Sequence, residues 1–421
     1  MDRSLKFSRT VSANLQYRIN TSIIFNYLRE KAPISRAEIS KDLKISAPAV
    51  SRVIEKLIGD GYVVETKKAE TKSGKKPTLL EINSRKGFVI GIDLGKERLK
   101  VALTNLNGKT IERYKGFKIS NNKDVGEKLI IEIRSILNKW DKKSNLDKNT
   151  LKAICAGVPA DVDIETGKII GAPLYGSWKD LNLKEILGKE FDVPVFIEND
   201  VNLSALGEKY YGRGKKFKDF VFMEISNGIG TGIIIDNHLF RGSYGSAGEI
   251  GFTITSPDNL GFKVKNKGFL EKFASVESIG KEAVRKVKEG RKSLITDMVD
   301  GDVKKIEPHV VCQAAIRGDS LANDIIINMV NLLSISLINL VLILNPQIIV
   351  IGGDISNLPE VDKLFVKTII EKVKSSIPFK IPEIDLSTLG ENAGIVGASF
   401  QAIESLMMSK FPYRIEEGVM S

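Results

Sequence analysis

The sequence contains few of the side chains from which disulfide frameworks and metal sites are built. Among its 421 residues there are two cysteines and two histidines. Cys155 and Cys312 lie far apart in apolar contexts, which excludes a disulfide framework and fits a reducing cytoplasm. His238 and His309 complete no zinc site with them at any familiar local spacing. We therefore expect no bound metal and no cofactor.

Long uninterrupted hydrophobic runs are also missing. The most apolar stretch, residues 325–344, contains five Asn and Ser side chains, each of which would be costly to place in lipid. This pattern predicts a buried core helix, with a subunit interface as the alternative, rather than a membrane span. The first ten residues are polar and charged, unlike a cleavable signal sequence. The expectation is a cytoplasmic protein without a membrane partner.

Positive charge is concentrated at one end of the chain. The length is sufficient for two or three domains, and the net charge is +11. Residues 1–86 hold 18 Lys and Arg against 9 Asp and Glu, whereas the remaining residues hold 45 against 43. A basic module ahead of a nearly neutral body indicates a partner with a phosphate backbone. A merely soluble basic domain is the alternative.

The start of the basic module carries the pattern of three helices. Apolar residues at helical spacing over residues 19–28 mark the first helix. Residues 35–38 form a capping box that opens a short second helix, ending at Leu43. Ser46 is expected to cap the third helix, in which Pro48 is tolerated because it lies in the first turn.

Two short strands follow the helices, over residues 62–66 and 78–82, and enclose a basic tip. Three helices and a hairpin with a cationic tip predict a winged helix-turn-helix that binds double-stranded operator DNA. A protein-interaction module of the same fold is the alternative. The side chains expected to reach bases or phosphates are Arg36, Ser46, Ala49, Ser51 and Arg52 on the helices and Lys75 and Lys76 on the wing.

The rest of the chain, residues 87–421, has the pattern of a two-lobed α/β body. Its first half is expected to form strands over 88–95, 99–103 and 153–158 and a helix around 125–140. Its second half repeats this order, with strands over 220–225, 232–235 and 346–353. Two such halves with facing glycine loops predict a ligand cleft between two lobes.

The polar chemistry is concentrated between Glu198 and Gly251. A buried strand there ends in Glu198-Asn199-Asp200, which places carboxylates and an amide where open α/β sheets bind small polar ligands. The glycine-rich turn at residues 228–232 offers backbone N–H groups to an anion. Taken singly, the first motif also fits a helix N-cap and the second a tight hairpin. Their order along the chain favours a pocket for sugar and phosphate.

Together these motifs resemble the ROK family of repressors and sugar kinases, and the resemblance covers nearly the whole chain. It implies an actin-like or hexokinase-like body behind the winged helix. The matching segments are Glu198-Asn199-Asp200, Gly228-Ile229-Gly230-Thr231-Gly232, Ala247-Gly248-Glu249-Ile250-Gly251, Leu344-Asn345-Pro346, Ile351-Gly352-Gly353, Gly394-Ile395-Val396-Gly397-Ala398 and, in the wing, Gly74-Lys75-Lys76-Pro77.

The resemblance also implies roles for four residues. In the family's kinases, the aspartate matching Asp200 is the general base on the sugar hydroxyl. The residues matching Asn199, Glu249 and Glu271 hold sugar hydroxyls, for which carboxylates and amides are suited because sugar diols present paired donors and acceptors. We therefore expect these four residues to bind sugar.

Departures from the family pattern bear on catalysis. The first phosphate loop of the family is Asp-x-Gly-Gly-Thr, whereas this chain has Lys96 and Glu97 after Gly95. The bulk of Lys96 and the charge of Glu97 are unfavourable for ATP. A vestigial phosphate loop without catalytic residues is therefore expected, comprising Asp93, Gly95, Gly228 and Gly230.

Other departures concern zinc and sugar contacts. Phe252 replaces a histidine that touches sugar and binds zinc in the family, and residues 261–271 lack the cysteines that normally follow. Leu174 and Tyr175 stand in a segment that is also an altered sugar contact. A phenylalanine near the ring hints at a ligand with one fewer polar group, a pentose or a differently epimerised hexose.

The favoured hypothesis is a DNA-binding transcription regulator, a repressor of sugar-utilisation genes. Residues 1–86 would bind DNA, and residues 87–421 would form a non-catalytic ROK body that senses a monosaccharide. A homodimer or higher oligomer would place two winged helices on the operator. One alternative is an ATP-dependent sugar kinase with a fused DNA-binding module, and another is a constitutive DNA-binding protein whose pocket is vestigial.

Overall fold

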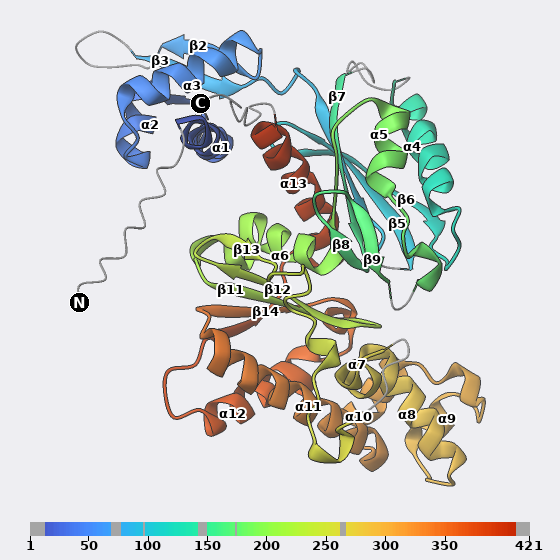
Figure 1. The fold of residues 1–421 in the computed structure, drawn as a ribbon. Coiled ribbons are helices and arrows are strands. Elements are labelled where there is room, and N and C mark those ends of the chain that lie inside the picture. Colours follow the sequence, from blue (N-terminus) through green and yellow to red (C-terminus); the bar gives the residue numbers. More distant parts are fainter. Residues whose placement is uncertain are drawn as a thin grey trace, which may run out of the picture.

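The computed structural model describes residues 13–68, 77–95, 97–141, 150–172, 175–261 and 267–409. A small N-terminal unit sits beside two larger lobes (Figure 1). Five residues named in the predictions lie outside the described residues: Gly74, Lys75, Lys76, Lys96 and Leu174.

The N-terminal unit has the predicted three helices and hairpin. Its elements are α1 (Ala13–Lys31), β1 (Ile34–Ser35), α2 (Arg36–Leu43), α3 (Ala47–Gly59), β2 (Val63–Lys68) and β3 (Thr78–Ile82). The strands form one sheet in the order β1-β3-β2. The sequence did not predict β1, because two residues carry no periodic pattern.

Helix starts in this unit agree with the sequence in one case and differ in another. Ser35 Oγ accepts the Glu38 N–H at 3.3 Å, and the Glu38 carboxylate accepts the Ser35 N–H at 2.9 Å, which confirms the capping box. Ser46 occupies the N-cap position of α3, but its side chain makes no capping hydrogen bond. That detail of the prediction was wrong, because Pro48 removes one of the two N–H groups that a cap would satisfy.

Lobe 1 is built on a five-stranded sheet in the order β10-β7-β4-β5-β6. Its strands are β4 (Phe88–Asp93), β5 (Arg98–Asn105), β6 (Thr110–Lys118), β7 (Leu151–Val158) and β10 (Val195–Asn199). The outer face is covered by α4 (Val125–Asp141) and α5 (Leu183–Phe191), and a ribbon of β8 (Asp161–Asp163) and β9 (Lys168–Gly171) follows β7 (Figure 1). The strands and helix predicted for this half are confirmed, with small shifts at their ends.

Lobe 2 repeats the same topology in the order β13-β12-β11-β14-β15. Its strands are β11 (Phe220–Ile225), β12 (Ile229–Ile235), β13 (His238–Phe240), β14 (Ile348–Gly352) and β15 (Glu383–Leu386). Its helices are α7 (Phe269–Ala274), α8 (Val276–Lys288), α9 (Leu294–Met298), α10 (Pro308–Ile316), α11 (Ser320–Leu344) and α12 (Lys367–Ser376). In each lobe three antiparallel strands are followed by two parallel ones, which confirms the predicted repeat.

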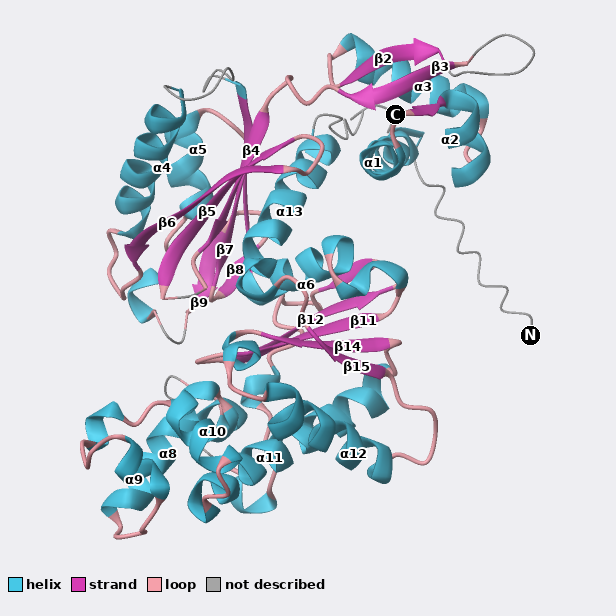
Figure 2. Cartoon of the chain, turned by 180° about the vertical axis from the view of Figure 1, so that it is seen from behind, coloured by secondary structure: helices cyan, strands magenta, loops and turns pink. Residues whose placement is uncertain are grey.

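Two helices lie between the lobe sheets, α6 (Asp200–Tyr211) and α13 (Ala393–Ser409), as Figure 2 shows from behind. They cross in backbone contact. A Cβ on Gly397 would overlap the carbonyl oxygen of Leu203, and one on Gly207 would overlap that of Ala393. Helix α13 packs on β4 and α6 packs on β12, so each helix belongs with a different lobe.

Helix α11 is the long apolar helix that the sequence predicted. Among the described residues it alone is long and apolar enough to cross a membrane by those two criteria. In the fold, one side of α11 is buried in the core beneath the lobe 2 sheet, as expected of a core helix. Its outer side leaves Ile327, Ile335, Leu342 and Ile343 exposed.

Candidate functional site

A cavity of about 920 Å³ lies between the two lobes. Its wall combines the loop after β4, the start of α6, the turn between β11 and β12 and the start of α7. The predicted site residues in this wall are Asn199, Asp200, Glu249, Glu271, Gly95, Gly228 and Gly230. Asp93 lies buried behind the loop, where its Oδ1 accepts the Gly95 N–H at 2.8 Å. The structure thus brings together residues that the chain distributes over both lobes.

Asn199 ends β10 and also caps α6. Its Oδ1 accepts the N–H groups of Val201 at 2.9 Å and Asn202 at 3.1 Å, while its Nδ2 donates to the Ala160 carbonyl at 3.4 Å. Asp200 opens the helix beside it, and its buried carboxylate accepts the Val201 N–H at 3.0 Å. The capping role considered for this motif is therefore real. It also holds both side chains in fixed orientations at the cavity.

The loop after β4 closes on Asp200. A Cβ on Gly95 would overlap Oδ2 of Asp200, so the approach requires glycine at this position. Glu97, on the same loop, lines the cavity. A carboxylate here is unfavourable for a phosphate group.

Glu271 holds the glycine turn between β11 and β12. Its Oε1 accepts the Ile229 N–H at 3.0 Å, and its Oε2 accepts the Gly268 N–H at 3.0 Å. A Cβ on Gly228 would lie 3.0 Å from Oε1. A negative charge therefore already satisfies one donor of the turn that was predicted to be a vestigial phosphate loop.

Glu249 lies among other carboxylates. Burial, followed by the nearby charges of Asp161 and Glu271, raises the pKa of Glu249 to about 7. Burial also raises the pKa of Asp161, against a smaller opposite effect of a hydrogen bond from Ser246. The site can therefore present Glu249 either as a hydrogen-bond acceptor or, when protonated, as a donor near neutral pH.

The wall also contains residues that the sequence reasoning did not assign to the site, among them Asp161, Tyr175 and Ser246. Asp161 follows β7 by three residues, and its position after a strand end was the available signal. Tyr175 stacks on the buried Trp178 with ring centroids 4.6 Å apart, although it had been noted only as an altered contact. Ser246 carried no signal beyond its place beside a predicted motif.

Negative charge dominates the described part of the cavity wall, which holds nine carboxylates against four cations. The cations are already engaged. Lys100 Nζ lies 2.8 Å from both the carbonyl oxygen and Oε2 of Glu391, and Lys267 Nζ lies 2.6 Å from Glu277. The wall therefore favours an uncharged, hydroxyl-rich ligand over an anion. Among the described residues, no group of three or more His, Cys, Asp or Glu side chains is arranged to hold a metal ion.

A buried ion pair joins the lobes beside the cavity. Arg241, in the loop after β13, donates from Nε and Nη2 to Oε2 of Glu198 at 2.8 and 2.7 Å. Oε1 of Glu198 accepts the Asn202 side-chain amide at 3.0 Å. The pair fixes the loop that leads to Glu249 against the end of β10.

The predicted DNA-contacting residues lie on α2 and α3. Ser46 and Arg52 are exposed, whereas Ala49 and Ser51 are half-buried. Arg36 pairs with Glu65 of β2 at 3.0 Å. The opposite face of α3 is buried as predicted, through Val50, Val53, Ile54 and Leu57. A short face of α3 with small and cationic side chains is thus available to a DNA groove.

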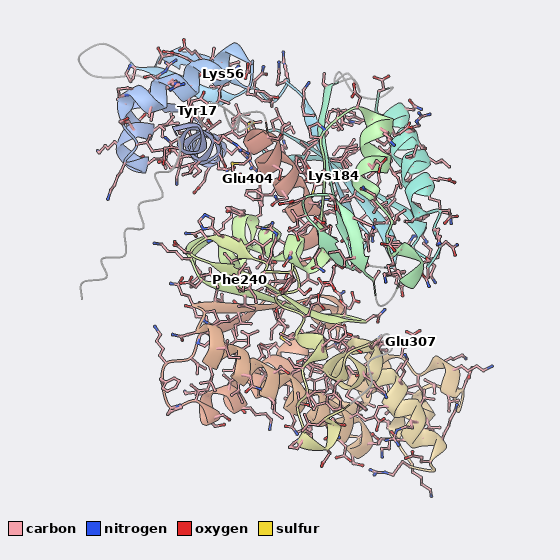
Figure 3. All side chains as sticks on the ribbon, viewed as in Figure 1. Tyr17, Lys56, Lys184, Phe240, Glu307 and Glu404 are labelled. Carbon is pink, nitrogen blue, oxygen red and sulfur yellow. The ribbon has the colours of Figure 1, made fainter. Side chains whose placement is uncertain are left out.

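The guanidinium group of Arg52 makes a cation–π contact with Tyr17 on α1, with 5.1 Å between its central carbon and the ring centroid. Tyr17 and Lys56 are labelled in Figure 3, on adjoining helices of this unit.

Comparison with known proteins agrees with this architecture. Residues 89–405 match the ROK family, and residues 20–64 match a winged helix-turn-helix DNA-binding family. The chain is 32% identical over 390 residues to the xylose repressor of Caldicellulosiruptor bescii, which covers 92% of this chain and 96% of that protein.

Solved structures give the same result. A ROK family transcriptional regulator, described as a homologue of the E. coli MLC protein, superposes with a TM-score of 0.79 at 26% identity over 93% of this chain and 97% of that one. A ROK family glucokinase from Streptomyces griseus shares the fold of the body, with a TM-score of 0.63 at 24% identity over 75% of this chain and 99% of that one. This chain belongs to the ROK family and carries a winged helix-turn-helix ahead of the family's two-lobed body.

Proposed function

We propose that this protein is a sugar-responsive DNA-binding repressor of sugar-utilisation genes. Residues 1–86 form its DNA-binding domain and residues 87–421 its sugar-binding domain. The observation that carries the proposal is the convergence of Asn199, Asp200, Glu249 and Glu271 on one cavity in a chain that also has a winged helix. The likeness to a xylose repressor along almost the whole chain supports it.

The effector is an uncharged monosaccharide, and D-xylose is the first to test. Nine carboxylates in the wall oppose phosphorylated and acidic sugars. The Tyr175 ring offers an apolar face to the C–H side of a sugar ring. Phe252, also in the wall, favours a ligand with one fewer polar group, which fits a pentose.

The body does not transfer phosphate. Glu97 and the Glu271 carboxylate lie at the two loops that a nucleotide phosphate would approach, and each disfavours an anion there. The specific observation that favours the alternative, a sugar kinase fused to a DNA-binding module, is Asp200. Its carboxylate lines the cavity, and the family resemblance matches this residue to the general base of the family's kinases.

The protein acts in the cytoplasm as a homodimer or a higher oligomer. The exposed apolar side of α11, defined by Ile327, Ile335, Leu342 and Ile343, is the surface we assign to a second copy. Ile327, Ile335 and Leu342 follow each other at helical spacing on this helix and Ile343 adjoins Leu342. Exposed apolar stripes of this kind are typical of interaction sites. Two winged helices on one dimer fit an operator with two half-sites.

The test is fluorescence anisotropy of a labelled duplex from upstream of the protein's own gene, at two salt concentrations, with and without D-xylose, D-glucose and N-acetylglucosamine. We expect binding tighter than to a random duplex, weaker at high salt, and changed by one sugar. Arg52→Ala should weaken DNA binding by about 1–3 kcal/mol. Asp200→Ala should remove the sugar effect, and Asp297→Ala, an exposed carboxylate on α9, should preserve it.

A coupled assay with ATP and each sugar tests the alternative. We expect no phosphorylated product. Phosphorylation of a sugar, together with no preference for the upstream duplex over random DNA, would replace the repressor with the kinase. Lack of thermal stabilisation by any of the sugars would leave a DNA-binding protein with a vestigial pocket.

A further inference from the structure

Helix α1 of the winged helix rests on two helices of the body at once. It packs along α13 and reaches the C-terminal end of α6 through Arg29. Apolar side chains of α1, α6 and α13 belong to one continuous core. In both views α13 runs from the region between the lobes up to α1 (Figures 1 and 2). Because α6 packs on lobe 2 and α13 packs on lobe 1, a change in the angle between the lobes would move the two helices that α1 contacts.

On the α13 side, one carboxylate accepts two hydrogen bonds from α1. Glu404 accepts hydrogen bonds from Ser22 Oγ on Oε1 and from Asn26 Nδ2 on Oε2. One turn further along α13, the Met408 carbonyl accepts the Arg18 Nε–H at 3.0 Å. Figure 3 places Glu404 at the end of α13 that faces the winged helix. The carboxylate therefore fixes α1 to the helix that packs on lobe 1.

On the α6 side, the contact is made by Arg29. Its Nη2 donates to the Tyr211 hydroxyl, and its guanidinium lies 5.2 Å from the ring centroid of Phe400 on α13. Its Nη1 donates to Asn26 Oδ1 at 3.1 Å. A continuous chain of hydrogen bonds thus runs from α13 through α1 to α6. We call the residues Asn26, Arg29, Tyr211 and Glu404 the α1 joint.

The opposite ends of the same two helices reach the cavity. Asp200 is the first residue of α6, and Glu391, two residues before α13, lines the wall and is held by Lys100 at 2.8 Å. With 17 residues, α13 extends about 25 Å. It crosses α6 in backbone contact at Gly397, so the two helices move against each other only as rigid bodies. A displacement of α6 or α13 at the cavity would therefore also displace the residues of the α1 joint at their other ends.

We propose that Glu404 is a positioning residue through which the sugar state of the cleft sets the orientation of the winged helix. The proposal rests on the proposed function. A sugar bound between Asp200, where β10 of lobe 1 runs into α6, and Glu249 of lobe 2 changes the angle at which α6 crosses α13. Since Glu404 fixes α1 to α13 while Arg29 ties it to α6, that change tilts the winged helix and alters its fit to operator DNA.

The test is an exchange of donor and acceptor in the full-length protein. In Glu404→Gln the negative charge and one of the two acceptor oxygens are lost, so Ser22 Oγ and Asn26 Nδ2 can no longer both donate to this side chain and the contact between α13 and α1 is weakened. In the double variant Asn26→Asp, Glu404→Gln, the introduced amide donates to the introduced carboxylate, which also accepts from Arg29, and the bond is restored. Gln401→Ala is the matched control, because Gln401 donates within α13, to Ser405 at 2.8 Å.

The readout is the ratio of the DNA dissociation constants with and without D-xylose, measured on the upstream duplex, alongside D-xylose binding by calorimetry. Coupled sites typically change affinity by about 5- to 150-fold. We expect Glu404→Gln to reduce the wild-type ratio to below about twofold while D-xylose affinity stays within about threefold. The double variant and Gln401→Ala should keep the wild-type ratio. A wild-type ratio in Glu404→Gln, or no recovery in the double variant, overturns the proposal.

A second measurement needs neither sugar nor DNA, so it distinguishes failure of this proposal from failure of the proposed function. Hydrogen exchange of the α1 amides should be faster in Glu404→Gln than in the wild type and in Gln401→Ala, with α11 amides unchanged. If D-xylose does not change DNA binding by the wild type, the proposed effector is wrong, and hydrogen exchange alone then tests whether Glu404 positions the winged helix. Unchanged exchange of α1 in Glu404→Gln means that the carboxylate does not position the winged helix.

Discussion

At the scale of single residues, Glu249 gives the pocket a dependence on pH. Its pKa is raised to about 7, first by burial and then by Asp161 and Glu271. If sugar hydroxyls donate to the ionised carboxylate, binding requires proton release below this pKa. We expect the dissociation constant for D-xylose to rise about tenfold between pH 8 and pH 6, measured by calorimetry. Glu249→Gln should bind more weakly at pH 8 and show no such change. A pH-independent wild type would contradict the assignment.

The same carboxyl group affects stability in the opposite sense. Because its folded-state pKa lies above its ordinary value of 4.5, the stability it contributes is present below pH 4.5 and is lost as pH rises through 7. In the absence of sugar, the Tm of Glu249→Gln minus the Tm of the wild type should therefore be larger at pH 8 than at pH 5. Scanning calorimetry at both values measures this difference.

The pair of Arg241 and Glu198 is a second feature of single residues. The Glu198 side chain is 6% exposed, so removing Arg241 leaves a buried carboxylate with neutral donors on Oε1 and without its cation on Oε2. Arg241→Ala should lower the free energy of unfolding in urea by about 3 kcal/mol or more. Arg213→Ala is the control, because Arg213 pairs with Asp385 at 3.1 Å on the surface, and its loss should cost less than about 1 kcal/mol. Equal losses of unfolding free energy in the two variants would mean that the buried pair stabilises the fold no more than the surface pair does.

At the scale of elements, the crossing of α6 and α13 depends on glycine. A Cβ on Gly397 would overlap the Leu203 carbonyl, and neither backbone can retreat without moving its helix. Gly397→Ala should destabilise the protein by about 3 kcal/mol and impair the sugar effect on DNA. Gly188 lies inside α5, and the nearest atom to its added Cβ is 4.0 Å away. Gly188→Ala should therefore stabilise by up to about 1 kcal/mol. Thermal unfolding of both variants makes the comparison.

Elements with strong local patterns were predictable from the sequence. The strand over residues 220–225 and the buried face of α3 were placed correctly, because period and burial coincide there. The gathering of Asn199, Glu249 and Glu271 in one cavity followed from the family resemblance. Contacts between distant positions were not predictable. Asn26 and Glu404 are separated by 378 residues, and no periodicity marks either as the partner of the other.

At the scale of the whole molecule, the proposed dimer depends on the exposed side of α11. Ile343 is 79% exposed on its outer side, and a charge there would be buried in the proposed dimer. We expect Ile343→Glu to shift the protein toward the monomer in sedimentation velocity and to weaken operator binding. Ile131→Glu is the control, since Ile131 is 67% exposed on α4 of lobe 1. A dimer that survives Ile343→Glu places the interface elsewhere.

The position of α13 in the chain has a consequence for biosynthesis. The helix that covers the inner face of the lobe 1 sheet, on β4, lies at residues 393–409. During translation the winged helix and the lobe 1 sheet are synthesised well before α13. The apolar inner face of the lobe 1 sheet therefore remains without this helix while lobe 2 is synthesised. A ribosome-bound or prematurely terminated chain can thus hold a folded DNA-binding unit that lacks its seat on α13. If α13 carries the sugar response as proposed, regulation by sugar begins only when synthesis has passed this helix.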